Sequence, residues 1–179
     1  MTHPHPHTHP HPHPHPHPHP HPLIDWNRAQ PAPLALWHLI HSNFKIARNL
    51  GIYNHRVIAG THTLSHHAEG RALDIGLLVA RPGEKLLGDQ LFEIFIDSAS
   101  VLGVDEIIWN HQISSASHPA VHHYHGQNPH IDHIHVGFTR AGSQNTAFPP
   151  VFLIRIAQLR TGLEDLTQPF VARGNSVVV

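Results

Sequence analysis

The chain has 179 residues, a formal net charge of −1 at pH 7 and no cysteine. Its length suits one ordinary domain, and the balance of 11 basic against 12 acidic residues gives no electrostatic footprint for nucleic acid or an anionic membrane. The lack of cysteine excludes disulfides, thiolate zinc sites and cysteine nucleophiles.

The amino-terminal 22 residues form a low-complexity segment in which histidine and proline alternate from His3 to Pro22, interrupted once by Thr8. Proline at every second position removes amide donors and disfavours helical geometry, which predicts an extended polyproline-II-like rod or a disordered chain. Three interpretations stay open: a semi-rigid spacer, a tract that binds metal ions or a partner protein, and a segment that becomes cationic on mild acidification.

Beyond this tail we expect one domain over residues 23–165 and a carboxy-terminal tail over 166–179. No stretch approaches the roughly 20 apolar residues that a membrane span needs. The amino terminus also lacks the basic and apolar regions of a secretory signal. If the protein acts outside the cytoplasm, we expect another export route.

Apolar residues at three- and four-residue spacing predict three helices in the domain. The first covers residues 33–50 with Gly51 just past its end, and the second covers 84–102 with Gly103 past its end. A last helix covers 151–161, and the remainder of the chain is expected to be weakly ordered.

Short β-rich segments predict strands over residues 56–59, 72–79, 104–109 and 131–138. Between the last two lies an expected loop, residues 114–128, rich in His, Ser and Gly. Strands mixed with helices in this way indicate an α+β fold.

Alternation along two of these strands points to a metal site. On strand 72–79 it places Asp74 with small neighbours on the face opposite Leu73 and Ile75, and on strand 131–138 it places His133 and His135 on one face. Together with His67, these segments offer His67, Asp74 and His135 as three metal ligands. Imidazole nitrogens and a carboxylate suit zinc, and three protein ligands leave a fourth position open for water, as in catalytic sites.

Several other residues near these segments have structural interpretations. Ser65 is expected to serve a turn or support the site, and Gly70 is expected to form a tight turn. The remaining histidines of the region are expected to be solvated loop residues: His62, His66, His118, His122 and His123.

Two motifs carry a family resemblance: SxHxxGxAxD over residues 65–74 and HxDHxH over 130–135. They resemble the M15-type D-alanyl-D-alanine peptidases and, more widely, the LAS group of zinc peptidases that cut peptidoglycan peptides. Residues 107–110 and 124–130 resemble one subgroup of that family. The resemblance implies a Hedgehog/DD-peptidase-like fold, in which a small antiparallel sheet with flanking helices carries a zinc site.

The resemblance also implies roles for individual residues. It assigns zinc to His67, Asp74 and His135, and it gives His133 the position of a residue that activates water or stabilises the transition state. Members that end in ExxH place a general base where this chain has Asp132, so the two assignments compete. Facing geometry favours His133, although a bulge could re-aim Asp132. His130 is expected to orient substrate or support the transition state.

The expected function is therefore zinc-dependent hydrolysis of peptidoglycan stem peptides or cross-links, as a carboxypeptidase or an endopeptidase. The HxH ending favours an endopeptidase. One departure concerns substrate binding, because the arginine that many members carry upstream of the first motif is missing here, and Arg56 or Arg71 would have to replace it. The alternative is a non-catalytic metal-binding or assembly protein with the same fold, which a fourth protein ligand from residues 118–125 would favour.

Overall fold

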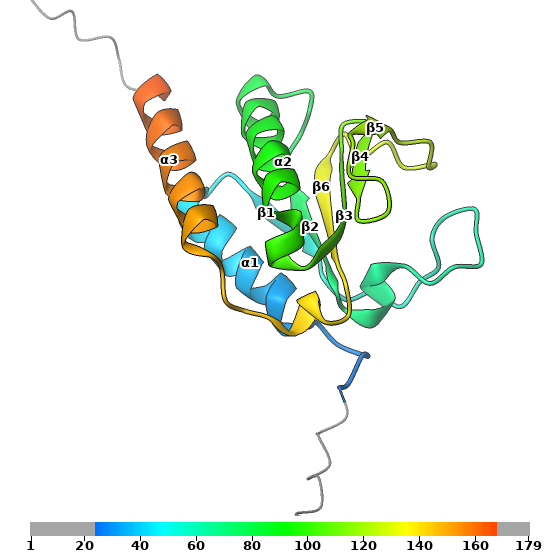
Figure 1. Ribbon diagram of the computed structural model, residues 1–179. Coiled ribbons are helices and arrows are strands. Elements are labelled where there is room, and N and C mark those ends of the chain that lie inside the picture. The colour runs from blue at the N-terminus through cyan, green and yellow to red at the C-terminus, as the bar shows by residue number, and fades with distance from the viewer. Residues whose placement is uncertain (1–23, 168–179) are drawn as a thin grey trace, which may run out of the picture.

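The computed structural model describes residues 24–167, which form a helical layer packed on one antiparallel sheet (Figure 1). The α-helices and short 3-10 helices of this region are α1 (Pro31–Asn43), η1 (His66–Glu69), α2 (Pro82–Leu102), η2 (Gly142–Gln144) and α3 (Pro150–Thr167). The strands are β1 (Arg48–Gly51), β2 (Ala72–Gly76), β3 (Val104–Trp109), β4 (Gln112–Ser115), β5 (His122–His123) and β6 (His133–Phe138). None of the described helices is both long and apolar enough to cross a membrane.

The six strands form a single sheet in the order β1-β2-β6-β3-β4-β5, and all neighbouring strands run antiparallel. The expected α+β class and small antiparallel sheet are therefore confirmed. The last strand of the chain, β6, lies between β2 and β3 at the centre of the sheet. This placement brings the second sequence motif beside the first.

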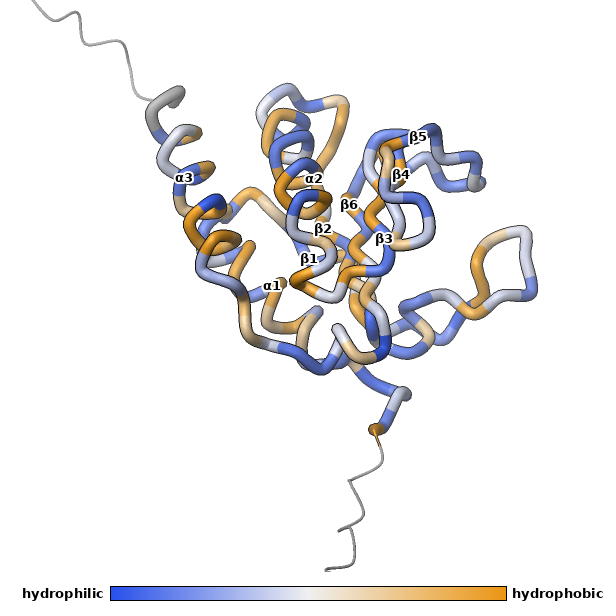
Figure 2. The backbone as a smooth tube through the Cα atoms, viewed as in Figure 1, coloured by the Kyte–Doolittle hydropathy of each residue, from blue (hydrophilic) through white to orange (hydrophobic). Residues whose placement is uncertain are grey.

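The core lies between the sheet and the three helices (Figure 1). Alternate residues of β2 and β6 face it, among them Leu73, Ile75, Ile134 and Val136, all fully buried. Figure 2 shows hydrophobic residues in the central strands and hydrophilic residues in the loops around β5. The helices cover one face of the sheet, so its other face is left for polar groups.

The second predicted helix and the strand after it are confirmed. Helix α2 ends at Leu102, and Gly103 follows in the left-handed conformation, with φ of 68°. Its amide donates to the carbonyls of Ala99 and Ser100, as expected of a residue that terminates a helix.

The first helix is shorter than predicted. It ends at Asn43 rather than at residue 50, and residues 48–51 form the edge strand β1. The Phe44 amide donates to the carbonyl of Ile40 at 2.8 Å, which satisfies one of the last four carbonyls of the helix. The chain is then free to pair with β2, an interaction that apolar periodicity in the segment does not reveal.

Other boundaries also differ from the sequence predictions: β2 ends at Gly76 rather than at residue 79, and β6 begins at His133 rather than at residue 131. Residues 56–59 contribute only an isolated bridge, Val57 to Leu64, and the expected loop 114–128 contains part of β4 and all of β5. The last helix continues to Thr167, so it passes the expected domain end at residue 165. The predicted tail over 1–22, and the part of the other tail beyond residue 167, lie outside the described residues.

Candidate metal centre

Strand pairing brings two of the predicted ligands together. In the register of β2 with β6, Asp74 stands directly opposite His135, and both side chains lie on the face away from the helices. The Asp74 Oδ1 to His135 Nδ1 distance is 2.9 Å. The neighbours of Asp74 on this face, Ala72 and Gly76, are small as predicted, and the side chains of Leu50 and Arg48 occupy the space beside Gly76.

The third predicted ligand comes from the short helix η1. The Ser65 hydroxyl accepts a hydrogen bond from the amide of His67 at 3.2 Å, and Gly70 ends the element with φ of 63°. The expected turn roles of both residues are therefore confirmed. His67 Nε2 lies 3.1 Å from Asp74 Oδ1 and 3.2 Å from His135 Nδ1, so the three predicted ligands converge.

Hydrogen bonds on the far side of each imidazole set which nitrogen faces this cluster. His67 Nδ1 donates to the carbonyl of Ile52 at 2.9 Å, and His135 Nε2 donates to Glu106 at 3.2 Å. When both rings are neutral, His67 Nε2 and His135 Nδ1 are therefore lone-pair acceptors, like the carboxylate oxygen between them. Three acceptor atoms that face one another repel unless a proton or a cation lies among them.

The donor set fits zinc. A tetrahedral ion with bonds of about 2.0 Å to nitrogen and oxygen holds its ligand atoms roughly 3.3 Å apart. The three distances here, 2.9, 3.1 and 3.2 Å, are close to that separation. The described residues bring no fourth His, Asp or Glu atom within 4.8 Å of all three ligand atoms. A cation held here would keep an open position.

The electrostatics of the cluster agree with this need for positive charge. Burial raises the pKa of Asp74, but hydrogen bonds from His135 and His67 outweigh it and hold the pKa well below its usual range. Burial lowers the pKa of His135, but the carboxylates of Asp74 and Glu106 outweigh it and raise this pKa to about 9. The cluster therefore attracts a proton in the absence of a metal, and a divalent cation would replace that proton.

The competing residues Asp132 and His133 form a pair. Strand β6 begins at His133, whose Nε2 lies 3.6 Å from Asp74 Oδ1. Asp132 precedes the strand, its side chain is 57% exposed, and its Oδ1 lies 2.7 Å from His133 Nδ1. Asp132 therefore faces away from the ligands, as regular alternation predicted, and it reaches them only through His133.

The third residue of the motif, His130, lies beside this pair. Its ring centroid is 4.7 Å from that of His133, and its Nδ1 donates to the carbonyl of Asn128 at 2.7 Å. His130 has φ of 53°, a conformation that non-glycine residues rarely adopt. Burial, together with the nearby His133, lowers the pKa of His130 to about 4, so the ring is neutral at pH 7.

A polar cavity of about 210 Å³ opens beside these residues. His130 and His135 line it together with Glu106, Tyr124 and Arg56. In residues 24–167 no hydrogen bond or ion pair holds the Arg56 guanidinium, whereas Arg71 pairs with Glu69 at 2.7 Å and donates to the carbonyl of Phe138. Of the two arginines considered as substitutes for the missing one, Arg56 is the one that reaches the cavity.

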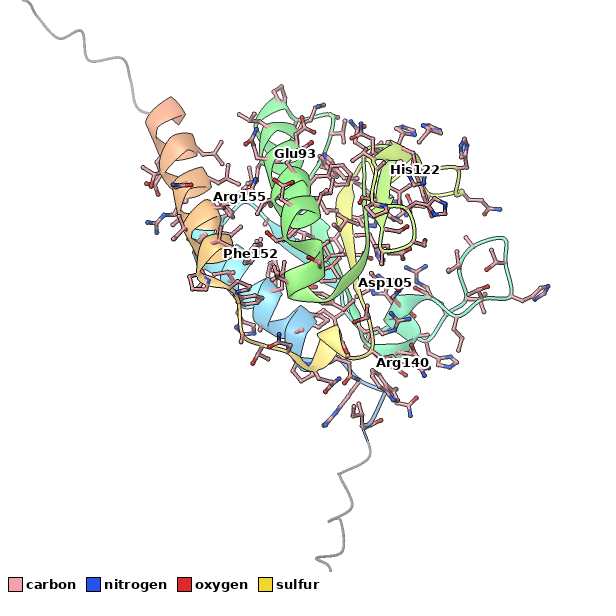
Figure 3. All side chains as sticks on the ribbon, in the orientation of Figure 1. Glu93, Asp105, His122, Arg140, Phe152 and Arg155 are labelled. Carbon is pink, nitrogen blue, oxygen red and sulfur yellow. The ribbon has the colours of Figure 1, made fainter. Side chains whose placement is uncertain are left out.

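The sequence analysis missed a second polar group on this face, made by His66, Asp105 and Glu106. His66 was expected to be solvated, but its side chain is only 13% exposed, because its ring packs between β3 and β6 residues. Figure 3 shows that Asp105 lies on β3, beside η1. The exposed His122, on β5, lies away from Asp105 and η1. The sequence did hold an indication of this group, because the acidic residues Asp105 and Glu106 lie within the otherwise apolar strand 104–109.

The other histidines expected to be solvated are exposed, as predicted: His62, His118, His122 and His123. None of the histidines in residues 118–125 joins the three ligands, since the described part of the chain contains no such group. Residues 118–125 therefore do not supply the fourth protein ligand that would have favoured the non-catalytic alternative.

The fold and the site together define an α+β protein with a buried His-Asp-His cluster. The family model of the VldE C-terminal domain matches residues 26–135, more than half of the chain, so the protein belongs to that family. The matched region includes His67, Asp74 and His135. Searches of curated proteins and of solved structures found no match.

Proposed function

We propose that this protein is a zinc-dependent peptidase that hydrolyses amide bonds in peptidoglycan stem peptides or their cross-links. The observation that carries the proposal is the convergence of His67 Nε2, Asp74 Oδ1 and His135 Nδ1 within 3.2 Å of one another, beside the His133–Asp132 pair. The resemblance of both motifs to the M15-type peptidases supplies the substrate class.

His67, Asp74 and His135 would hold the zinc ion. When bound, zinc lowers the pKa of a water molecule towards about 7 and polarises a carbonyl group. The ring of His133 supplies the general base, because Asp132 keeps the proton on Nδ1 and leaves Nε2 free on the side of the ligands. His133 Nε2 takes a proton from the attacking water and returns it to the leaving amine.

In this scheme Asp132 is a positioning residue. It contacts the ring of His133 and stabilises the imidazolium that forms when Nε2 takes the proton. The proposal thus gives each of the two competing residues its own role: His133 is the base, and Asp132 orients its ring.

The cavity supplies the groups that would contact substrate. His130 is neutral at pH 7 and its Nδ1 is held by Asn128, so its Nε2 is available to a substrate oxygen or amide. Arg56 supplies a positive charge on the cavity wall, which suits a carboxylate of the stem peptide. An open position at the ligand cluster favours this catalytic function over the non-catalytic alternative.

The test is mass spectrometry of purified peptidoglycan digested with the zinc-loaded full-length chain. His133→Ala is the main variant, and His118→Ala, which changes an exposed histidine between β4 and β5, is the matched control. We expect new amine ends or lost D-alanine with the parent and the control, and at least 100-fold less product with His133→Ala. Intact muropeptides from the folded, zinc-containing parent would refute the proposal.

A further inference from the structure

The second polar group on the open face of the sheet shares one residue with the first. His66 Nδ1 lies 3.0 Å from Glu106 Oε1, and His135 Nε2 lies 3.2 Å from the same oxygen. One ligand atom from each of these three residues therefore lies within 4.8 Å of the others. They come from η1, β3 and β6, so three separate elements converge on one point.

When His66 is neutral, one of its two ring nitrogens faces a carboxylate without a proton. Each ring nitrogen of His66 faces a carboxylate, because its Nε2 also lies 2.8 Å from Asp105 Oδ2. A neutral imidazole has a single N–H, so when Nε2 donates to Asp105, the lone pair of Nδ1 faces Glu106. A lone pair directed at a carboxylate oxygen is the arrangement already found among the three ligands of the first cluster.

We infer that His66 Nδ1, Glu106 Oε1 and His135 Nε2 form a second site for a borderline divalent cation, in which the imidazole of His135 bridges two ions. The inference rests on the metal centre proposed above, because His135 binds the first ion through Nδ1. When the second ion binds, the proton on His135 Nε2 leaves to solvent, and Glu106 exchanges that hydrogen bond for a bond to the metal.

The chemistry of the group defines the class of cation. Two imidazoles and one carboxylate suit Zn²⁺ or Cu²⁺, and they are a poor match for Mg²⁺ or Ca²⁺, which prefer oxygen ligands. Asp105 holds the other nitrogen of His66, as carboxylates commonly do for metal-binding histidines. Glu106 and His135 line the polar cavity, so an incoming ion has a path to them from solvent.

The local charge also favours a second cation. Three carboxylates lie close together in this group. The His66 ring contacts Asp105 and Glu106, and the His135 ring contacts Glu106 and Asp74. Within residues 24–167, the nearest guanidinium in an ion pair with any of these three carboxylates is that of Arg71, 3.8 Å from Asp105. Two divalent ions would compensate this concentration of negative charge.

Zinc stoichiometry tests the second site. Full-length chains are loaded with Zn²⁺, dialysed against a weak chelator and measured by elemental mass spectrometry. We expect Glu106→Gln and His66→Ala to retain about one ion fewer per chain than the parent and His118→Ala. The histidines of residues 1–22 are present in all four proteins, so their contribution cancels in the difference. Equal zinc content in all four would overturn the inference and leave Glu106 as a group that only orients His135.

Asp74→Asn separates this inference from the proposed function, because Asp74 belongs only to the first cluster. If Asp74→Asn retains as much zinc as the parent, the first metal centre is wrong. If it loses zinc while the His66 and Glu106 variants do not, only the second site is wrong. Circular dichroism melting of each variant checks that it is folded.

A second measurement needs no variant. In the parent loaded with Cu²⁺, an imidazolate bridge couples the two copper spins antiferromagnetically. We therefore expect the integrated electron paramagnetic resonance signal to fall short of the total copper by about two spins per chain. A spin count equal to the total copper would contradict the bridge.

Discussion

The face of the sheet that packs against the helices and the face that carries the histidines differ in what covers them. On the first face, three helices bury apolar residues such as Leu73 and Val136. On the second face, which the short helix η1 contacts, Asp74, His133 and His135 are also less than 10% exposed. The same two central strands therefore supply both environments.

The comparison teaches that burial has different causes on the two faces. Apolar side chains on the helix face are stabilised by removal from water, and residues of similar volume can replace one another at modest cost. Buried polar side chains on the other face are tolerated only because each has a partner. We expect substitutions on the helix face to change stability and substitutions on the histidine face to change chemistry.

The largest effect is expected from His135→Ala. The change removes a proposed ligand of the first ion, so zinc retention and peptidoglycan hydrolysis should both be abolished. Ile134→Val is the matched control, because Ile134 is the neighbouring residue on the opposite face and the change costs only about 1 kcal/mol. Elemental analysis and muropeptide mass spectrometry measure the outcome, and hydrolysis retained by His135→Ala would contradict the ligand assignment.

On the helix face, Phe95→Ala is expected to lower the free energy of unfolding by about 3–5 kcal/mol. Phe95 is fully buried, and its ring stacks on Phe152 with centroids 6.1 Å apart. Urea denaturation measures the loss. Activity per folded molecule should be unchanged, and a selective loss of activity would show that the two faces are not independent.

Gly70→Ala tests the element that carries His67. A Cβ atom at residue 70 would lie 1.7 Å from the carbonyl oxygen of Arg28, and its φ of +63° disfavours other residues. We expect a loss of about 3 kcal/mol in unfolding free energy. In Gly162→Ala, where a Cβ meets open space on α3, we expect no loss and a gain of up to about 1 kcal/mol. Equal unfolding midpoints for the two variants would refute this explanation.

The smallest effect concerns pH and the start of α2. The Glu84 carboxylate is buried and accepts a hydrogen bond from Arg48 at 2.7 Å, which lowers its pKa from 4.5 to about 2. Because the folded-state pKa is the lower one, the stabilisation is present above pH 4.5 and is lost as the pH falls towards 2. Solvent screens the partly exposed Arg48, so we expect about 2 kcal/mol.

Thermal unfolding between pH 2 and 6 measures this contribution. Glu84→Gln should be less stable than the parent near neutral pH, and its stability should depend less on pH over this interval. The same slope in parent and variant would show that Glu84 does not carry the effect.

The two-residue period of strands made much of the first cluster predictable. Alternation alone placed Asp74 opposite the apolar face of β2 and put His133 with His135 on one face of β6, and the structure confirms both placements. Helix α2 and its glycine stop were predictable for a similar reason, because local periodicity and local backbone preference agree there.

Pairing between distant segments was not predictable in this way. Helix α1 stops at Asn43 and β1 follows, although apolar spacing continues, because residues 48–51 form hydrogen bonds with β2. The contact of Asp132 with His133 also depends on where β6 begins. These boundaries follow from hydrogen bonding across the sheet, which a single sequence does not display.

The sequence by itself determined which donor atoms the protein can present, since residue type and alternation decide which face of a strand each side chain occupies. Only the tertiary structure decided that β6 lies between β2 and β3, and therefore that Glu106 and His66 meet the ring of His135. The physical reason is that a nitrogen and an oxygen interact over about 3 Å in space, whatever the number of residues between them.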